Sequence, residues 1–286
     1  MSRELAHGQR RLLLEALWSS PLPRSYTNFV GRWLLGAVHT ARQLAAFALI
    51  TLGVMVTRRG QAPAVMRPLL AHHLARAGLH LLPMTALLAA ALGWVVVGQT
   101  VALLSRVGAQ DYVGTVMVLA VVRELGPLAT ALLVLLRVGV PAVIELGTAR
   151  AHGEVEALEA LGIDPVHFLV VPRVVGMTVA AVALCAYLVL GAVAAGFLFA
   201  FLQDVPLKPG EYARQMAAAL TGMDFLLLGL KSAGFGLIIA LVCCFQGLAR
   251  PLELREVARA STTAVVAAVL GCVTLDAAFI VVYLLL

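Results

Sequence analysis

The sequence predicts an all-α integral membrane fold with five transmembrane helices, and three observations support this. The 286 residues are 62% hydrophobic and 13% charged, and their mean hydropathy is +0.97. Soluble domains carry roughly 45–50% apolar and about 25% charged residues, so a soluble core could not bury this much apolar surface. The apolar residues also gather in long runs, and a membrane-spanning helix needs about 20 of them in succession.

Five apolar runs reach that length and are joined by more polar segments. The third run is longer than a bilayer requires, so its helix must tilt or extend beyond the membrane. The expected spans are residues 81–104, 112–136, 166–202, 225–245 and 264–286.

Residues 1–76 are mixed in composition and are expected to form N-terminal cytoplasmic or interfacial helices, ahead of a transmembrane domain at 77–286. The segment 44–56 is apolar over only 13 residues, which is short of the roughly 20 that a span needs. We therefore expect it to lie in the interface or to insert in part. The alternative is a sixth span, if its helix extends backward past Arg42.

Arginine and lysine residues are divided unevenly between the two sides of this topology. Fifteen of them fall in the segments 1–80, 148–173 and 249–263, whereas three fall in the opposite connections. Connections rich in Arg and Lys stay on the cytoplasmic side of a membrane. The N-terminus is therefore expected in the cytoplasm and the C-terminus on the opposite side.

Two charges stand in the middle of the second span, directly before a helix break. A charge at the bilayer centre costs roughly 2.5–3.5 kcal/mol on insertion scales, so Arg123 and Glu124 need a reason to be there. Gly126 and Pro127 follow them. Pro127 has no N–H to donate, so the carbonyl of Arg123 loses its helical partner and the helix should kink beside a cavity or an interface.

Neighbouring residues on a helix do not face each other, so Arg123 and Glu124 each need a partner on another helix, or water. Lys231 in the fourth span and Asp276 in the fifth lie at neighbouring depths, which favours an ion pair between them. Structural pairing between helices is the alternative to a functional role for all four charges.

Residues 148–162 predict a short helix between the second and third spans. Val155, Leu158 and Leu161 repeat every three residues and form an apolar stripe. Gly162 is a favourable stop for a helix. Such a helix suits the groove of a partner protein, and a solvated surface helix is the alternative.

Several kinds of chemistry are not expected in this chain. It has no Gly-Lys dipeptide, so it lacks the phosphate-binding P-loop of ATPases. Its four cysteines all lie in apolar runs without the spacing of a metal site. It also lacks the HExxH and GxSxG motifs of hydrolases. We expect no catalytic residue, no metal and no cofactor in this chain.

The region from Arg123 to Gly176 resembles the signature region of the MlaE/YrbE permeases, the membrane subunits of ABC-type lipid transporters with Mce-domain partners. The resemblance spans roughly residues 70–286 in the family's order. The matching pieces are Arg123 to Pro127, Arg137 to Gly139, Glu145 to Gly147, Arg150, Glu159 to Gly162, Asp164-Pro165, Val171 to Arg173, Lys231-Ser232, Gln246-Gly247 and Ala260 to Thr263, leading to Asp276.

The resemblance implies a fold, partners and a site. Five transmembrane helices and interfacial N-terminal helices would form a homodimer in the bacterial inner membrane, with the C-terminus in the periplasm. A separate cytoplasmic ATPase would supply ATP and Mg. A lipid, most often a phospholipid, would pass towards a periplasmic Mce-domain protein; no nucleic acid is implied. The cavity would involve Arg123, Glu124, Gly126 and Pro127, and the coupling helix to the ATPase would use Arg150, Glu154, Val155, Leu158, Glu159 and Leu161.

The chain also departs from the family pattern at Val140-Pro141 and at His152-Gly153-Glu154. A glycine inside the coupling helix would weaken it by roughly 1 kcal/mol relative to alanine. The ATPase contact would then be altered, or the chain would work with a second, different permease. Two further alternatives remain: a secondary transporter that uses Glu124 and Asp276 as proton sites, and a membrane scaffold that transports nothing.

Overall fold

The computed structural model describes residues 24–58, 63–108, 112–202, 209–248 and 255–285, and these ranges are helical without a strand. The chain divides into two compact units with the boundary between Ala46 and Phe47. The helices are α2 (Arg24–Thr57), α3 (Pro63–Ala77), α4 (Leu82–Val107), α5 (Val113–Met117), α6 (Gly126–Val134), α7 (Val140–Ala151), α8 (Glu154–Ala160), α9 (Val171–Leu202), α10 (Pro209–Ala219), α11 (Gly222–Leu248) and α12 (Val257–Leu285), with a 3₁₀ turn η1 (Leu79–Leu81) before α4.

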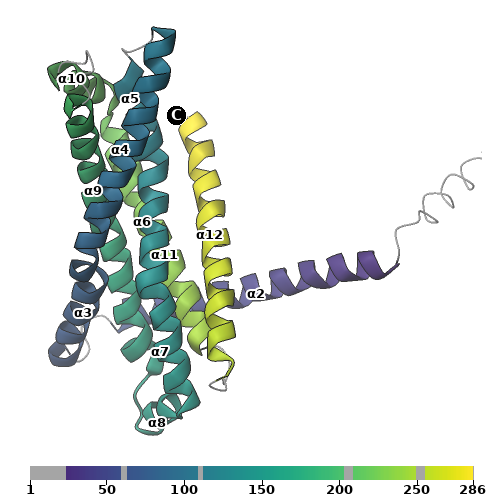
Figure 1. Cartoon of the computed structure of the whole chain (residues 1–286). Helices are drawn as coiled ribbons and strands as arrows, with labels where there is room; N and C mark the ends of the chain where they lie inside the picture. Colours follow the sequence, from purple (N-terminus) through teal and green to yellow (C-terminus); the bar gives the residue numbers. More distant parts are fainter. Residues whose placement is uncertain (1–23, 59–62, 109–111, 203–208, 249–254, 286) are drawn as a thin grey trace, which may run out of the picture. The chain divides into compact units, whose positions relative to one another are not determined.

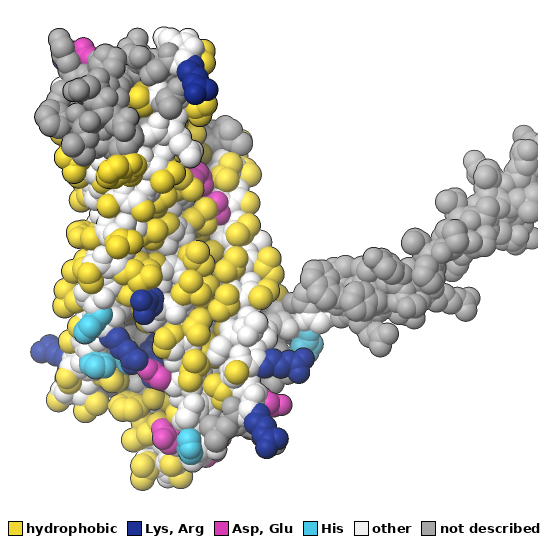
Figure 2. Space-filling model, viewed as in Figure 1, with side chains coloured by type: hydrophobic (Ala, Val, Ile, Leu, Met, Phe, Trp, Pro, Cys, Tyr) yellow, Lys and Arg dark blue, Asp and Glu magenta, His cyan; other side chains and the backbone are white. Residues whose placement is uncertain are grey.

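Within the second unit, α4, the consecutive helices α5 to α7, α9, α11 and α12 run side by side (Figure 1). Helix α9 packs against α4 and α11, and α12 packs against α11 and α7. Helix α8 lies at one end of this bundle and α10 at the other; we call these the α8 end and the α10 end. Hydrophobic side chains cover the surface between the two ends (Figure 2), as expected for helices whose solvent is lipid.

The expected all-α integral membrane fold is confirmed, but the number of candidate spans is six and not five. Among the residues that the structure describes, six helices are long and apolar enough to cross a membrane, and the additional one is Val38–Thr57, with the lowest mean hydropathy of the six. The difference arises because the helix around 44–56 continues backward past Arg42.

The contacts of residues 47–58 place them across the α8 end of the bundle. The Phe47 ring lies 5.7 Å from the ring of Phe245, near the last turn of α11. Arg58 Nη1 lies 3.3 Å from Asp164 Oδ2, in the connection after α8. Both ends of this segment therefore contact the same end of the bundle.

In the described part of the chain, three π-helical segments widen the bundle helices, and each ends two residues before a proline. They are η3 (Val118–Leu125) before Pro127, η4 (Leu135–Gly139) before Pro141 and η5 (Val166–Val170) before Pro172. A proline in a helix has no N–H and its ring clashes with the carbonyl four residues earlier. One extra residue in the preceding turn moves that carbonyl away, so the break expected at Pro127 is a widened turn and the helix continues to Ala151.

The connection between α7 and α9 differs from the single helix expected at 148–162. Residues 148–151 belong to α7, and α8 covers only Glu154–Ala160. Gly153 lies between the two helices with φ +75°, a conformation that side chains disfavour. The expectation that Gly153 weakens a helix from inside was therefore wrong, because the chain turns at this glycine.

Gly162 ends α8, as its position in the sequence predicts. It has φ +75°, its N–H donates to Glu159 O at 2.9 Å, and the N–H of Ile163 donates to Leu158 O at 2.9 Å. These two bonds form a Schellman motif, which satisfies carbonyls at the end of a helix.

Helices α4 and α9 are in close contact at Gly93. A methyl group on Gly93 would lie 2.9 Å from both the carbonyl carbon of Ala192 and the backbone nitrogen of Gly196. Small residues let membrane helices reach this separation, so Gly93 determines how close the two helices come.

Candidate functional site

A buried lysine joins three of the bundle helices at the level of the widened turn before Pro127. Lys231 on α11 is fully buried, and its Nζ lies 2.9 Å from Glu124 Oε2, 2.6 Å from Asp276 Oδ1 and 2.8 Å from the carbonyl oxygen of Arg123. An ammonium group has three N–H donors, so each has an oxygen within reach. The structure thus brings together Glu124, Lys231 and Asp276, which lie in three separate expected spans.

The proline explains why one of these oxygens belongs to the backbone. Pro127 cannot donate to the carbonyl of Arg123, and Lys231 Nζ donates to it instead. An unpaired carbonyl inside a bilayer costs several kcal/mol. The carbonyl that Pro127 leaves without a donor and the buried ammonium group of Lys231 therefore satisfy each other's hydrogen-bonding needs.

Arg123 reaches a carboxylate that the sequence analysis did not identify. Its Nε lies 2.9 Å from Asp224 Oδ1, and its guanidinium lies 5.1 Å from the centre of the Tyr283 ring, within the range of a cation–π contact. Asp224 is held by the N–H and the hydroxyl of Thr221, at 2.9 Å and 2.8 Å. Asp224 could have been found from the sequence, because it lies two helical turns before Lys231 on α11 and therefore on the same face of that helix.

The charge network, defined as Arg123, Glu124, Asp224, Lys231 and Asp276, has a buried part and an accessible part. Lys231 and Asp224 are 0% and 2% exposed, whereas the side chains of Arg123 and Glu124 are 28% and 30% exposed. Arg123 and Glu124 can therefore meet a polar ligand while their buried partners hold them in place.

The other two residues predicted for the cavity lie in the packing of the bundle. Gly126 and Pro127 are both buried. A methyl group on Gly126 would lie 2.8 Å from Val189 Cγ2 of α9. Gly126 therefore allows close packing against α9. Pro127 leaves the Arg123 carbonyl free to accept from Lys231.

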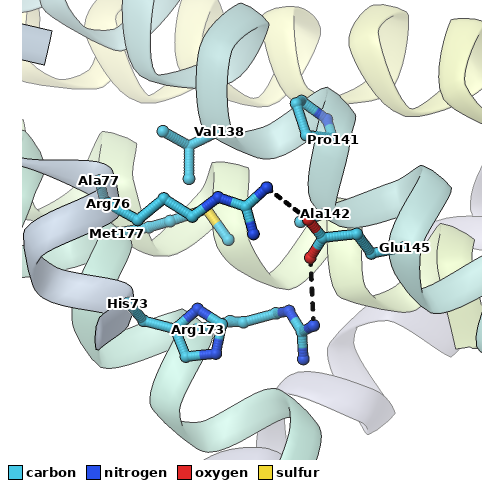
Figure 3. Close-up of a pocket in the computed structure, with 9 residues that line it drawn as sticks. All are labelled: His73, Arg76, Ala77, Val138, Pro141, Ala142, Glu145, Arg173 and Met177. Atoms are coloured by element: carbon cyan, nitrogen blue, oxygen red, sulfur yellow. Dashed lines mark hydrogen bonds and ion pairs between the residues drawn. The ribbon is translucent and has the colours of Figure 1, made fainter. Parts of the chain in front are cut away.

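A second charged cluster lies at the α8 end and was not assigned a role from the sequence (Figure 3). Arg76 Nη2 lies 2.6 Å from Glu145 Oε1, and Arg173 Nη2 lies 3.3 Å from Glu145 Oε2. Arg173 Nη1 also donates to Leu169 O at 2.7 Å. One carboxylate thus joins α3, α7 and α9 close to α8.

The residues predicted for the coupling helix divide into two groups. Arg150 belongs to α7 and its Nε lies 3.8 Å from Glu156 Oε1, while Val155 is buried against the bundle. Leu158 is half-buried, and Glu154, Glu159 and Leu161 are exposed. Leu161 is 75% exposed, so this apolar side chain is not covered by the rest of the chain.

Comparisons with known proteins agree on a class. A sequence model of the family described as "Permease MlaE" matches residues 70–282. A probable ABC transporter permease of Rickettsia conorii is 30% identical over 245 residues, covering 84% of this chain and 90% of its own length. A probable ABC transporter permease of Synechocystis is 32% identical over 169 residues, covering 57% and 62% of the two chains. The chloroplastic protein Trigalactosyldiacylglycerol 1 of Arabidopsis thaliana is 30% identical over 175 residues, covering 60% and 49%.

Proposed function

The chain belongs to the MlaE family of permeases, and from this premise we propose that it is the membrane subunit of an ATP-driven lipid transporter. It would move phospholipid or a related lipid between the bacterial inner membrane and a periplasmic Mce-domain partner. The family match over residues 70–282 carries the proposal. The name of the Arabidopsis relative, which is that of a galactolipid, supports a lipid cargo.

The mechanism proposed for this chain involves no covalent chemistry. Two copies form a homodimer, and a separate cytoplasmic ATPase binds ATP and Mg. The ATPase docks at the α8 end, which faces the cytoplasm because the basic connections lie there. Movement of α8 is passed along α7 and α6 to the charge network, where Arg123 binds the lipid's polar group.

The role of Arg123 can be tested by reversing its charge. We expect Arg123→Glu to lower lipid transfer between reconstituted vesicles about tenfold or more, because the new carboxylate would stand beside Asp224 and repel an anionic headgroup. The matched control is Arg106→Glu, at an exposed arginine in the last turn of α4. Transfer at the wild-type rate by the Arg123 variant would remove this residue from the cargo path. Reduced transfer caused only by failed assembly would favour the scaffold alternative.

The docking of the ATPase can be tested at Leu161. We expect Leu161→Asp to reduce co-purification of the ATPase about tenfold or more, because an apolar side chain that fills a partner's pocket is replaced by a carboxylate. Val107→Asp is the control, since Val107 is 81% exposed at the α10 end. Undiminished ATPase binding to the Leu161 variant would place the contact elsewhere.

A further inference from the structure

A basic cavity opens at the α8 end, away from the charge network. Its volume is about 740 Å³, and its wall comes from α3, η1, the start of α4 and the π-helical segment η4. The charged and polar side chains of the wall are Arg76, Arg137, His72 and His80, and none of its eight lining residues is acidic. A cavity of this size holds a small organic ligand, and its charge favours an anionic one.

The two arginines are not fully neutralised by the protein. Arg76 shares the single carboxylate of Glu145 with Arg173, as the dashed contacts in Figure 3 show. Arg137 has no carboxylate within ion-pair distance among the residues that the structure describes; its Nε lies 3.3 Å from Met84 Sδ. An exposed guanidinium with free N–H groups is suited to bind a phosphate through two parallel hydrogen bonds.

The position of the cavity at the margin of the hydrophobic surface indicates a lipid as the source of that phosphate. The apolar part of the wall includes Leu81 and Met84, where the apolar run of α4 begins. In Figure 2, His side chains lie beside Lys or Arg side chains at the margin of the hydrophobic surface towards the α8 end. A ligand in the cavity would contact basic side chains on one side and apolar side chains, at the level of the lipid acyl chains, on the other.

We propose that this cavity binds the phosphate headgroup of an anionic phospholipid of the surrounding leaflet. Arg137 and Arg76 bind the phosphate oxygens, the two histidines border the headgroup, and the first acyl carbons lie along Leu81 and Met84. Basic pockets between membrane helices bind anionic headgroups in this way. The proposal goes beyond transport, because the bound lipid acts as a fixed part of the α3–α4–η4 contact.

The test counts lipids retained by the purified full chain. The chain is placed in nanodiscs of equal phosphatidylglycerol and phosphatidylcholine and analysed by native mass spectrometry. We expect phosphatidylglycerol to be retained selectively, and Arg137→Gln to lower its retention about tenfold, which is the value of one charge-assisted hydrogen bond. Arg67→Gln is the matched control, because Arg67 is an exposed arginine of α3 outside the cavity.

Two further samples separate this site from others. Repeating the count with Arg123→Glu removes a contribution from the proposed cargo site, and the selective retention should persist. Adding 10 mM inorganic phosphate, about the level of a phosphate buffer, should not release the lipid, since the acyl chains contribute to binding. Equal retention of the two lipids, an unaffected Arg137→Gln variant, or release by phosphate would each overturn the proposal. The count requires neither ATP nor transport, so its failure and that of the transport function are distinguishable.

Discussion

Replacing Lys231 with methionine is expected to destabilise the chain by about 3–5 kcal/mol, the cost of removing one partner from a buried ion pair. Methionine fills a similar volume, so the loss is electrostatic. Glu124 and Asp276 would be left close together without a cation, and the Arg123 carbonyl would lose its donor. Each of these groups would then be without its hydrogen-bond or ion-pair partner inside the bundle, which raises the free energy of the folded state.

Thermal unfolding in detergent measures this effect. Cys185, Cys243, Cys244 and Cys272 are all buried, so a thiol-reactive fluorophore reports unfolding without an engineered cysteine. We expect the midpoint to fall by on the order of 10 °C. Arg106→Met, at an exposed cation of α4, is the control and should change the midpoint little.

A triple variant separates charge pairing from a general packing defect. Lys231→Met combined with Glu124→Gln and Asp276→Asn has no unpaired charge at the centre of the network. We expect it to recover most of the lost stability, because replacing a whole buried ion cluster by neutral groups is often close to neutral. If the triple variant were as unstable as Lys231→Met, the loss would come from packing and not from charge.

Replacing Gly93 with leucine is expected to prevent correct folding of the bundle. The new side chain would overlap backbone atoms of Ala192 and Gly196 on α9, and backbone atoms cannot move aside as a flexible side chain can. Overpacking of this kind costs about 3 kcal/mol. The expected result is loss of the monodisperse peak in fluorescence-detected size-exclusion chromatography.

Gly53→Leu is the matched control for this experiment. It introduces the same residue into a helix, but apart from its chain neighbours and the nearby backbone of its own helix no atom lies within 4 Å of the position that its Cβ would take. Leucine also has a higher helix propensity than glycine by roughly 0.8 kcal/mol, so this variant should behave at least as well as the wild type. A normal elution profile for Gly93→Leu would mean that α4 and α9 are farther apart than the structure has them.

The sequence predicted what depends on composition and local chemistry, and missed what depends on contact between distant segments. The apolar runs placed the five bundle helices, and Pro127 predicted that the Arg123 carbonyl would lose its helical partner. The group that replaces this partner, Lys231, is 108 residues away, and no local pattern reveals such a pairing. Asp224 was missed for the same reason.

The start of the expected coupling helix was misplaced because two signals gave opposite indications. The spacing of Val155, Leu158 and Leu161 favours a helix through 148–162, whereas Gly153 can either weaken a helix or turn the chain. Only the positive φ at Gly153 distinguishes the two. The apolar stripe then divides, since Val155 packs inward and Leu161 remains outside.

The widened turns before Pro127 and Pro141 change the direction in which the later side chains of the helix face. A widened turn contains one residue more than the usual 3.6, which shifts the angular position of every later side chain by about 100°. From Val113 to Ala151 the helix axis is continuous, but two such phase shifts divide it into three sections. The three sections therefore present different faces to the neighbouring helices than one uninterrupted α-helix of the same sequence would.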